Sequence, residues 1–327
     1  MKSARALALP LGLGAVVSAL VLGCTGGPDG WPDRPGPKVV ASFPPVASVA
    51  MAVAGPDAVV LPVMSGQSPH GGEPKPSELR LLRRADLFAI NGLGLDDRLA
   101  KKFADTSARP IRVVNLGAAI DPKDLLDGGA CEHEGHDHAA HAHGEGGDNT
   151  DPHAWLGLKH ARTYAAKLAA ELGQADAPHA ADYDARAKAF AAKLDTLQAD
   201  GDALFRGKAD RKFLPFHASM GYFAQSFGLT MIEPIQVVPG QEPSPKKLEE
   251  IVKTCLDRKV RVIAVEPQFS AQSSAKRIRD ELTRRGLADV VLVELDPLET
   301  CPAGELSGDW YEAKMRANVV ALAGALK

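Results

Sequence analysis

The chain has 327 residues, of which 45% are hydrophobic, and its formal net charge is −3. This length allows two lobes, because single domains usually run to roughly 100–200 residues, and the apolar content excludes wholesale disorder. A near-neutral chain without a basic stripe argues against a nucleic-acid partner, which would be held by neutralisation of phosphates.

The first residues are typical of an export signal and not of a folded domain. Lys2 and Arg5 form a basic start, an apolar run follows, and Val-Leu-Gly-Cys ends at Cys24. A small residue before a cysteine, directly after an apolar run, resembles a bacterial lipobox. We therefore expect residues 1–24 to be a lipoprotein signal peptide, with Cys24 lipidated and the protein anchored to a membrane of the cell envelope. Residues 25–37, rich in Gly, Pro and Asp, would be a flexible tether. A plain secretory signal or a short membrane anchor is the alternative.

From residue 38 onward, short β-branched segments alternate with helical patterns, which predicts parallel sheets flanked by helices. In the first half we expect strands at 38–43, 58–64, 86–91 and 112–116, with helices such as 76–84 and 96–104 between them. In the second half we expect strands at 212–216, 230–235, 260–266 and 290–295, separated by helices at 218–227, 245–258 and 271–285. The fold class is therefore α/β, with an N-terminal lobe over 38–172 and a C-terminal lobe over 211–327.

Between the two halves lies a helical tract without a strand signal. One helix is expected at 159–172 and a second at 178–205. Within the second, apolar residues recur at helical spacing at Tyr183, Ala187, Phe190, Leu194 and Leu197. A helix of about 28 residues is roughly 40 Å long, enough to run along a whole domain. We interpret residues 173–210 as a long connecting helix, with an ordinary amphipathic helix as the plainer alternative.

Residues 131–150 form a low-complexity insert without periodicity, which we expect to be mobile. It holds five of the ten histidines: His133, His136, His138, His141 and His143. Their irregular spacing among glycines and acids predicts weak, transient metal binding, and a solvated insert without a metal role is the alternative. Cys131 would be either an additional soft ligand or an incidental free thiol.

Three further histidines and one aspartate are placed so that they could meet. His70 follows the second expected strand, His217 lies at the end of the fifth, and Asp296 comes just after the last. His153, in Asp-Pro-His-Ala-Trp-Leu, opens the helical tract. Ligands of open parallel sheets gather outside the carboxyl ends of the strands, so a cleft between the lobes could bring these four together. Three imidazoles and one carboxylate suit Zn2+, although for any single histidine a core or surface role is the alternative.

Several short motifs carry a resemblance to a known family over nearly the whole chain after the signal. They are VVASFPPVASVA at 39–50, SPHGGEPKPSELRLLRRADLFAINGLGLD at 68–96, DPHAWL at 151–156, FHASMGYFAQSFGL at 216–229, PSPKKLEEIV at 243–252, VIAVEPQFS at 262–270 and ELDPL at 294–298. In this order they resemble the metal-binding solute-binding lipoproteins of ABC transporters, the ZnuA/TroA/PsaA group, and most of all its zinc-type branch.

The resemblance implies two α/β lobes, one long connecting helix and one metal ion between the lobes. Its ligand positions match His70, His153 and, for the acidic fourth ligand, Asp296. The third position distinguishes the metals, because zinc carriers have histidine there and many manganese carriers have glutamate. His217 occupies it here. Imidazole favours Zn2+ over the harder Mn2+, which prefers oxygen, so we expect Zn2+, with Mn2+ or iron as the alternative.

The sequence departs from the family pattern at two places. After the first histidine, Gly-Gly-Glu73 replaces the usual acidic or aromatic stretch, which leaves the fourth ligand open between Asp296, Glu73 and water. His160 stands where the family usually has asparagine, and we expect it on the surface of its helix. Glu266, at the end of a strand, is a candidate carboxylate behind a ligand or an ordinary strand-end acid.

The resemblance also implies a disulfide between Cys255 and Cys301, as in zinc-type relatives. It would close a loop of about 46 residues and stabilise the fold by about 4 kcal/mol in the chain-entropy account.

The expected function is a binding protein and not an enzyme. It would capture Zn2+ in the periplasm or cell envelope, as a monomer, and deliver it to a membrane ABC permease. The rival from another class is a metallohydrolase with three histidines and an open water position. No His-Glu-x-x-His or Gly-x-Ser-x-Gly motif supports that rival. A metal-storage lipoprotein that uses mainly the histidine insert is a further alternative.

Overall fold

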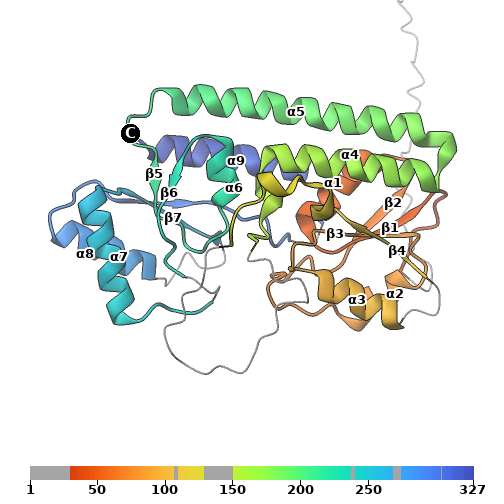
Figure 1. Ribbon diagram of the computed structural model, residues 1–327, viewed down its shortest axis with the longest axis horizontal. Helices are drawn as coiled ribbons and strands as arrows, with labels where there is room; N and C mark the ends of the chain where they lie inside the picture. The colour runs from red at the N-terminus through yellow and green to blue at the C-terminus, as the bar shows by residue number, and fades with distance from the viewer. Residues whose placement is uncertain (1–29, 107–109, 129–149, 237–239, 268–273, 303) are drawn as a thin grey trace, which may run out of the picture.

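The computed structural model describes residues 30–106, 110–128, 150–236, 240–267, 274–302 and 304–327. Two lobes, each with a parallel sheet flanked by helices, lie side by side beneath one long helix (Figure 1). The expected α/β class is confirmed.

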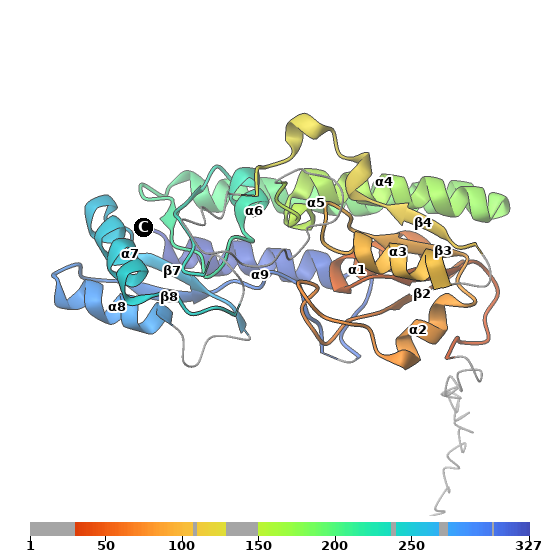
Figure 2. The same cartoon turned by 60° about the horizontal axis from the view of Figure 1, so that its bottom comes forward.

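The first lobe is built on a four-stranded parallel sheet of order β2-β1-β3-β4. Its strands are β1 (Lys38–Ala41), β2 (Val59–Pro62), β3 (Leu87–Ile90) and β4 (Arg112–Asn115). The helices α2 (Pro76–Leu82) and α3 (Asp97–Thr106) lie on one side of the sheet, and α1 (Pro44–Ala54) lies on the other (Figure 2). Both faces are covered, so β3 is buried along its whole length, which explains its continuous apolar sequence.

The second lobe has two short strand pairs that together make one sheet. They are β5 (Lys212–Phe213) with β6 (Thr230–Met231) and β7 (Val262–Val265) with β8 (Val291–Glu294). A bridge between Leu214 and Ile263 joins the two pairs. The helices α7 (Pro245–Arg258) and α8 (Ser274–Arg284) pack an outer core against this sheet, which includes Leu214, Ile263, Ile251 and Ile278. All strands lie where the sequence predicted them, but most are shorter.

Three long helices cross the junction of the lobes. They are α4 (Leu158–Ala175), α5 (Ala180–Arg206) and α9 (Trp310–Ala325). The helix α5 has 27 residues and runs along both lobes (Figure 1). The five apolar positions predicted for its inner face are all buried. The prediction of a long connecting helix is therefore confirmed, while the lobe boundaries at 173 and 210 stay a prediction.

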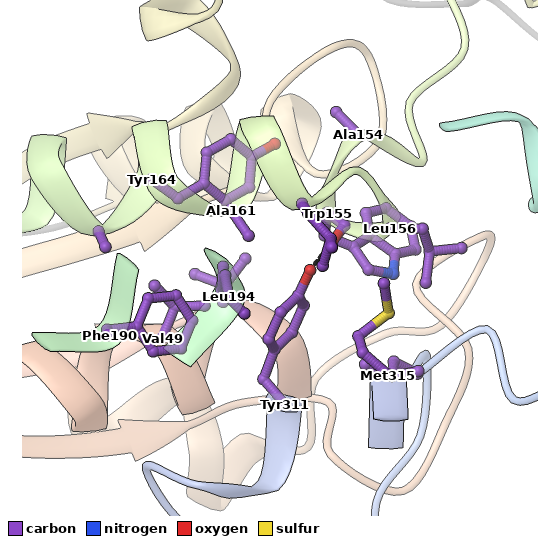
Figure 3. Packing of buried hydrophobic residues seen from close by; sticks show 14 of the residues in the cluster. Val49, Ala154, Trp155, Leu156, Ala161, Tyr164, Phe190, Leu194, Tyr311 and Met315 are labelled. Carbon is purple, nitrogen blue, oxygen red and sulfur yellow. Dashed lines mark hydrogen bonds between the residues drawn. The ribbon is translucent and has the colours of Figure 1, made fainter. Parts of the chain in front are cut away.

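One hydrophobic core continues from the first lobe into the second. It includes Val46 of α1, Tyr164 of α4, Phe190 of α5, Phe213 of β5 and Met315 of α9. Figure 3 shows Phe190 and Leu194 of α5 packed near Tyr311 of α9 and Trp155. We call this set the central core. Because both lobes contribute to it, a large separation of the lobes would expose apolar surface to water.

The predicted disulfide between Cys255 and Cys301 is wrong. Both thiols are free and buried. Cys255 lies in the outer core of the second lobe, and burial raises the pKa of its thiol to about 12. Cys301 lies in the central core, where its backbone N–H donates to the carbonyl of Ser65 at 2.8 Å. The two cysteines therefore belong to different packing units.

Some expected features lie outside the described residues. They are the signal segment with Cys24, Cys131, and the insert histidines His133, His136, His138, His141 and His143. Among the described helices, none is both long enough and apolar enough to cross a membrane.

Candidate metal centre

Three histidines and one glutamate meet at the junction of the lobes. His70 follows β2, His153 stands directly before a short 3-10 turn that leads into α4, and His217 follows β5. Glu299 follows β8. Their ligand atoms all lie within 4.8 Å of one another. His153, His217 and Glu299 are buried, whereas the side chain of His70 is 20% exposed and marks the open side of the group. The structure thus brings together the three histidines that the strand ends predicted.

The distances within this group fit a small tetrahedral cation. The Nε2 atoms of His70 and His153 are 2.9 Å apart. Glu299 Oε1 lies 3.2 Å from His70 Nε2, 3.4 Å from His217 Nε2 and 3.8 Å from His153 Nε2. Ligands at zinc–nitrogen and zinc–oxygen distances of about 2.0–2.2 Å would be about 3.3 Å apart at the corners of a tetrahedron. Only small shifts separate the observed atoms from that arrangement.

Asp296, the expected fourth ligand, does not lie in this group. Its Oδ2 accepts a hydrogen bond from Lys314 Nζ at 3.0 Å, and its Oδ1 accepts one from the backbone N–H of Leu298 at 2.8 Å. Asn318 pairs with its backbone in both directions, at 2.9 and 2.7 Å. The carboxylate is therefore occupied in holding the loop after β8, and Glu299, three residues later, faces the histidines.

A left-handed residue explains why the acid at 299 was missed. Leu298 is fully buried and has a φ of 64°, a conformation that leucine rarely adopts. It turns the chain between the two acids. A strand-end argument identifies the first acid after a strand and cannot foresee such a turn. Glu73, the other sequence candidate, is exposed and also lies outside the group.

Two of the histidines are held from behind by carboxylates. Asp151 Oδ1 lies 2.7 Å from His153 Nδ1 and also accepts the backbone N–H of His153 at 2.9 Å. Glu266 is hydrogen-bonded to His217 Nδ1, the role considered for it from the sequence. A carboxylate that accepts the Nδ1 proton fixes the ring and leaves the Nε2 lone pair for a cation. Both rings are therefore oriented before any metal arrives.

The pKa values follow from burial and from these partners. Burial lowers the pKa of His153, and the hydrogen bond with Asp151 offsets only part of this effect. Burial also opposes protonation of His217, but its hydrogen bonds with Glu266 and Glu299 outweigh burial and raise its pKa to about 10. Burial would raise the pKa of Glu299, yet its partners His217 and His70 hold it well below the usual range. The site can therefore receive a cation in exchange for protons.

A buried polar network supports the segment that carries His153. Asn91 donates to the carbonyl of Pro152 at 3.0 Å and accepts from the hydroxyl of Tyr164 at 2.7 Å. From the second lobe, the hydroxyl of Tyr222 donates to the carbonyl of Asp151 at 2.9 Å. Residues of both lobes thus fix the backbone on either side of this histidine.

His160, expected on the surface, is buried. It lies in the first turn of α4, and its ring meets that of Tyr222 at a centroid distance of 5.0 Å and an angle of 87°. A Cβ atom at Gly157 would lie 2.7 Å from His160 Cδ2, so the glycine makes room for the ring. The prediction failed because the inner face of α4 extends to its first turn, where α6 (Gly221–Ser226) packs against it.

Comparisons with known proteins point to one family. Residues 39–325 match the family model described as ZnuA, zinc-uptake complex component A, periplasmic. The zinc-binding protein AdcA of Streptococcus pyogenes serotype M1 is 28% identical over 299 residues, which cover 87% of this chain and 55% of AdcA. The chain therefore spans about half the length of that relative.

Two further likenesses concern the metal and the fold. The manganese-binding lipoprotein MntA of Halalkalibacterium halodurans is 31% identical over 163 residues, which cover 49% of this chain and 47% of MntA. A mutant structure of the laminin-binding adhesin Lmb from Streptococcus agalactiae superposes with a TM-score of 0.74 at 26% identity. It covers 89% of this chain and 100% of that one.

Proposed function

Because the chain belongs to the ZnuA family of periplasmic zinc-uptake components, we propose that it captures Zn2+ in the cell envelope and delivers it to an ABC permease. The ligands would be the Nε2 atoms of His70, His153 and His217 together with Oε1 of Glu299. The observation that supports this best is the convergence of these four atoms within 4.8 Å. The cation is cargo in this proposal, held until the permease takes it.

The donor set favours zinc over the other divalent metals. Three neutral imidazoles with one carboxylate suit a borderline cation, whereas Mn2+ prefers oxygen ligands. The zinc-binding relative AdcA covers more of the chain than the manganese-binding MntA does. Mn2+ or iron remains the alternative cargo.

The same four atoms favour a carrier over a hydrolase. A catalytic zinc keeps one position open for the water that it activates. Here Glu299 would supply the fourth donor beside the histidines. A closed four-ligand site holds a cation but offers it no water to activate.

The remaining parts of the proposal concern segments outside the described residues. Lipidation of Cys24 would tether a monomeric protein beside its permease. The insert histidines would collect Zn2+ weakly and raise its concentration near the site. Metal affinity should fall in acid, because protons compete for imidazole.

A competition titration against a chromophoric zinc chelator tests the proposal. The protein would begin at Thr25 and be compared with and without residues 131–148, with Mn2+ measured in parallel. We expect about one tightly bound Zn2+ per chain in both forms, far weaker binding of Mn2+, and loss of tight binding in His217→Ala. Loss of the tight site on deletion of the insert, or a preference for Mn2+, would contradict the proposal.

A further inference from the structure

The two oxygen atoms of Glu299 have different surroundings. Oε1 is the atom in contact with the Nε2 atoms of all three histidines. It is buried and has no hydrogen-bond partner among the described residues. Oε2 accepts a hydrogen bond from the hydroxyl of Ser68 at 2.7 Å. One oxygen is therefore presented to the cation, and the other is held by a neutral donor.

Ser68 is tied closely to the first histidine of the site. The backbone N–H of His70 donates to Ser68 Oγ at 3.3 Å. Only Pro69 stands between the two residues, and its ring fixes one backbone angle. Because a serine hydroxyl has a single hydrogen, that hydrogen is committed to Glu299. Ser68 thus links the loop that bears one ligand to the side chain of another.

The backbone on both sides of Glu299 is also held in place. The indole N–H of Trp155 donates to the carbonyl of Pro297 at 2.9 Å, and the N–H of Cys301 donates to the carbonyl of Ser65 at 2.8 Å. With the backbone fixed, the remaining freedom of Glu299 is mainly rotation of its side chain. The bond to Ser68 is the contact that sets this rotation.

We infer that Ser68 determines metal specificity by keeping Glu299 a one-oxygen ligand, an inference that rests on the function proposed above. A carboxylate bound through one oxygen completes a four-coordinate site with three histidines, the geometry that Zn2+ adopts. A carboxylate free to turn could offer both oxygens and open the site to higher coordination, which Mn2+ favours with oxygen ligands. Ser68 touches the ligand and not the cation, so it acts as a positioning residue.

The test compares Ser68→Ala with Ser68→Thr in the otherwise unaltered chain. Zn2+ and Mn2+ affinities would be measured by chelator competition. One equivalent of Co2+ would report coordination number, because four-coordinate Co2+ absorbs visible light much more strongly than six-coordinate Co2+. We expect Ser68→Ala to lower the preference for Zn2+ over Mn2+ by about 10- to 100-fold, the usual effect of losing a partner behind a ligand, and to weaken the Co2+ absorption. Ser68→Thr keeps the hydroxyl and should restore both readouts.

Ser48→Ala provides a matched control. The Ser48 hydroxyl also joins distant segments, since it donates to the carbonyl of Ser307 at 2.7 Å and accepts from the N–H of Tyr311 at 3.0 Å. Its loss would lower stability without touching a ligand, so the metal preference and the Co2+ spectrum should stay as in the unaltered chain.

The outcomes separate this inference from the function on which it rests. If the unaltered chain binds Zn2+ tightly but Ser68→Ala keeps the same preference and spectrum, the role of Ser68 is overturned and the zinc carrier stands. If Ser68→Thr behaves like Ser68→Ala, the hydroxyl is not the cause and the inference also fails. If the unaltered chain binds no Zn2+ tightly, the proposed function itself is wrong.

Discussion

Trp155 and Pro297 are joined by a hydrogen bond of 2.9 Å from the indole N–H to the carbonyl oxygen. Trp155 lies two residues after His153, and Pro297 lies two residues before Glu299. The bond therefore ties together the backbone segments of two candidate ligands. The Ser68–Glu299 bond adds the loop of His70 to the same unit. His217, whose partner Glu266 follows β7, is the one candidate ligand outside it.

The first prediction concerns which acid completes the site. Glu299→Gln should weaken Zn2+ binding by about 100-fold or more, because losing a direct ligand should cost at least as much as losing a partner behind one. Asp296→Asn should change the affinity much less, since its carboxylate holds Lys314 and the loop backbone. Chelator competition on both variants measures the difference. An equal loss in the two variants would show that Asp296 also reaches the metal.

The different fates of these two acids show what the sequence could and could not predict. Strand ends predicted His70 and His217 correctly, because a parallel sheet places all its carboxyl ends at one edge. Glu299 depends on the left-handed turn at Leu298, which no periodicity or turn residue announces. His160 was missed for a similar reason, since its burial depends on contact with Tyr222 from the other lobe.

Periodic elements were easier to predict than single side chains. The five apolar positions of α5 identified its buried face, because a helical repeat over many residues leaves little ambiguity. The Cys255–Cys301 pairing had no comparable support from the residues. It followed only from the family resemblance, and the two thiols lie in separate cores.

The second prediction concerns the carboxylate behind His217. Glu266→Gln keeps the shape of the side chain but removes its charge, so His217 should become a weaker ligand. We expect Zn2+ affinity to fall by about tenfold, the lower end of the range for such partners. Glu294→Gln is the matched control, because this exposed glutamate lies opposite Val265 at the end of the neighbouring strand. Similar affinities for the two variants would remove Glu266 from the binding apparatus.

The third prediction concerns the stability of the metal-free chain at different pH values. Burial raises the pKa of Asp96 to about 6 from 3.8, although its carboxylate accepts hydrogen bonds from the backbone N–H groups of Asn91 and Gly92. The folded state therefore binds this proton more tightly than the unfolded state does. The resulting contribution to stability is complete below about pH 4 and is lost as the pH rises through about 6.

The measurement for Asp96 is denaturant unfolding across this pH range. Two pKa units correspond to about 3 kcal/mol, so the free energy of unfolding should contain a decrease of about this size between pH 4 and pH 7. In Asp96→Asn that decrease should be absent, and the difference between the two pH profiles isolates the group from other titrating residues. Parallel profiles would mean that Asp96 titrates alike in the folded and unfolded states.

The fourth prediction concerns the motion that accompanies metal release. The central core includes residues of both lobes, and α5 runs along both of them (Figure 1). A wide opening would expose this core to water, at roughly 25 cal/mol for each Å² of apolar surface. We therefore expect the segment after β5 that carries His217 to move by only a few ångströms, while His70, His153 and Glu299 stay together as one unit. Crystal structures of the metal-bound and metal-free protein measure this motion directly. Rotation of one whole lobe by tens of degrees would contradict the expectation, because it requires the central core to divide.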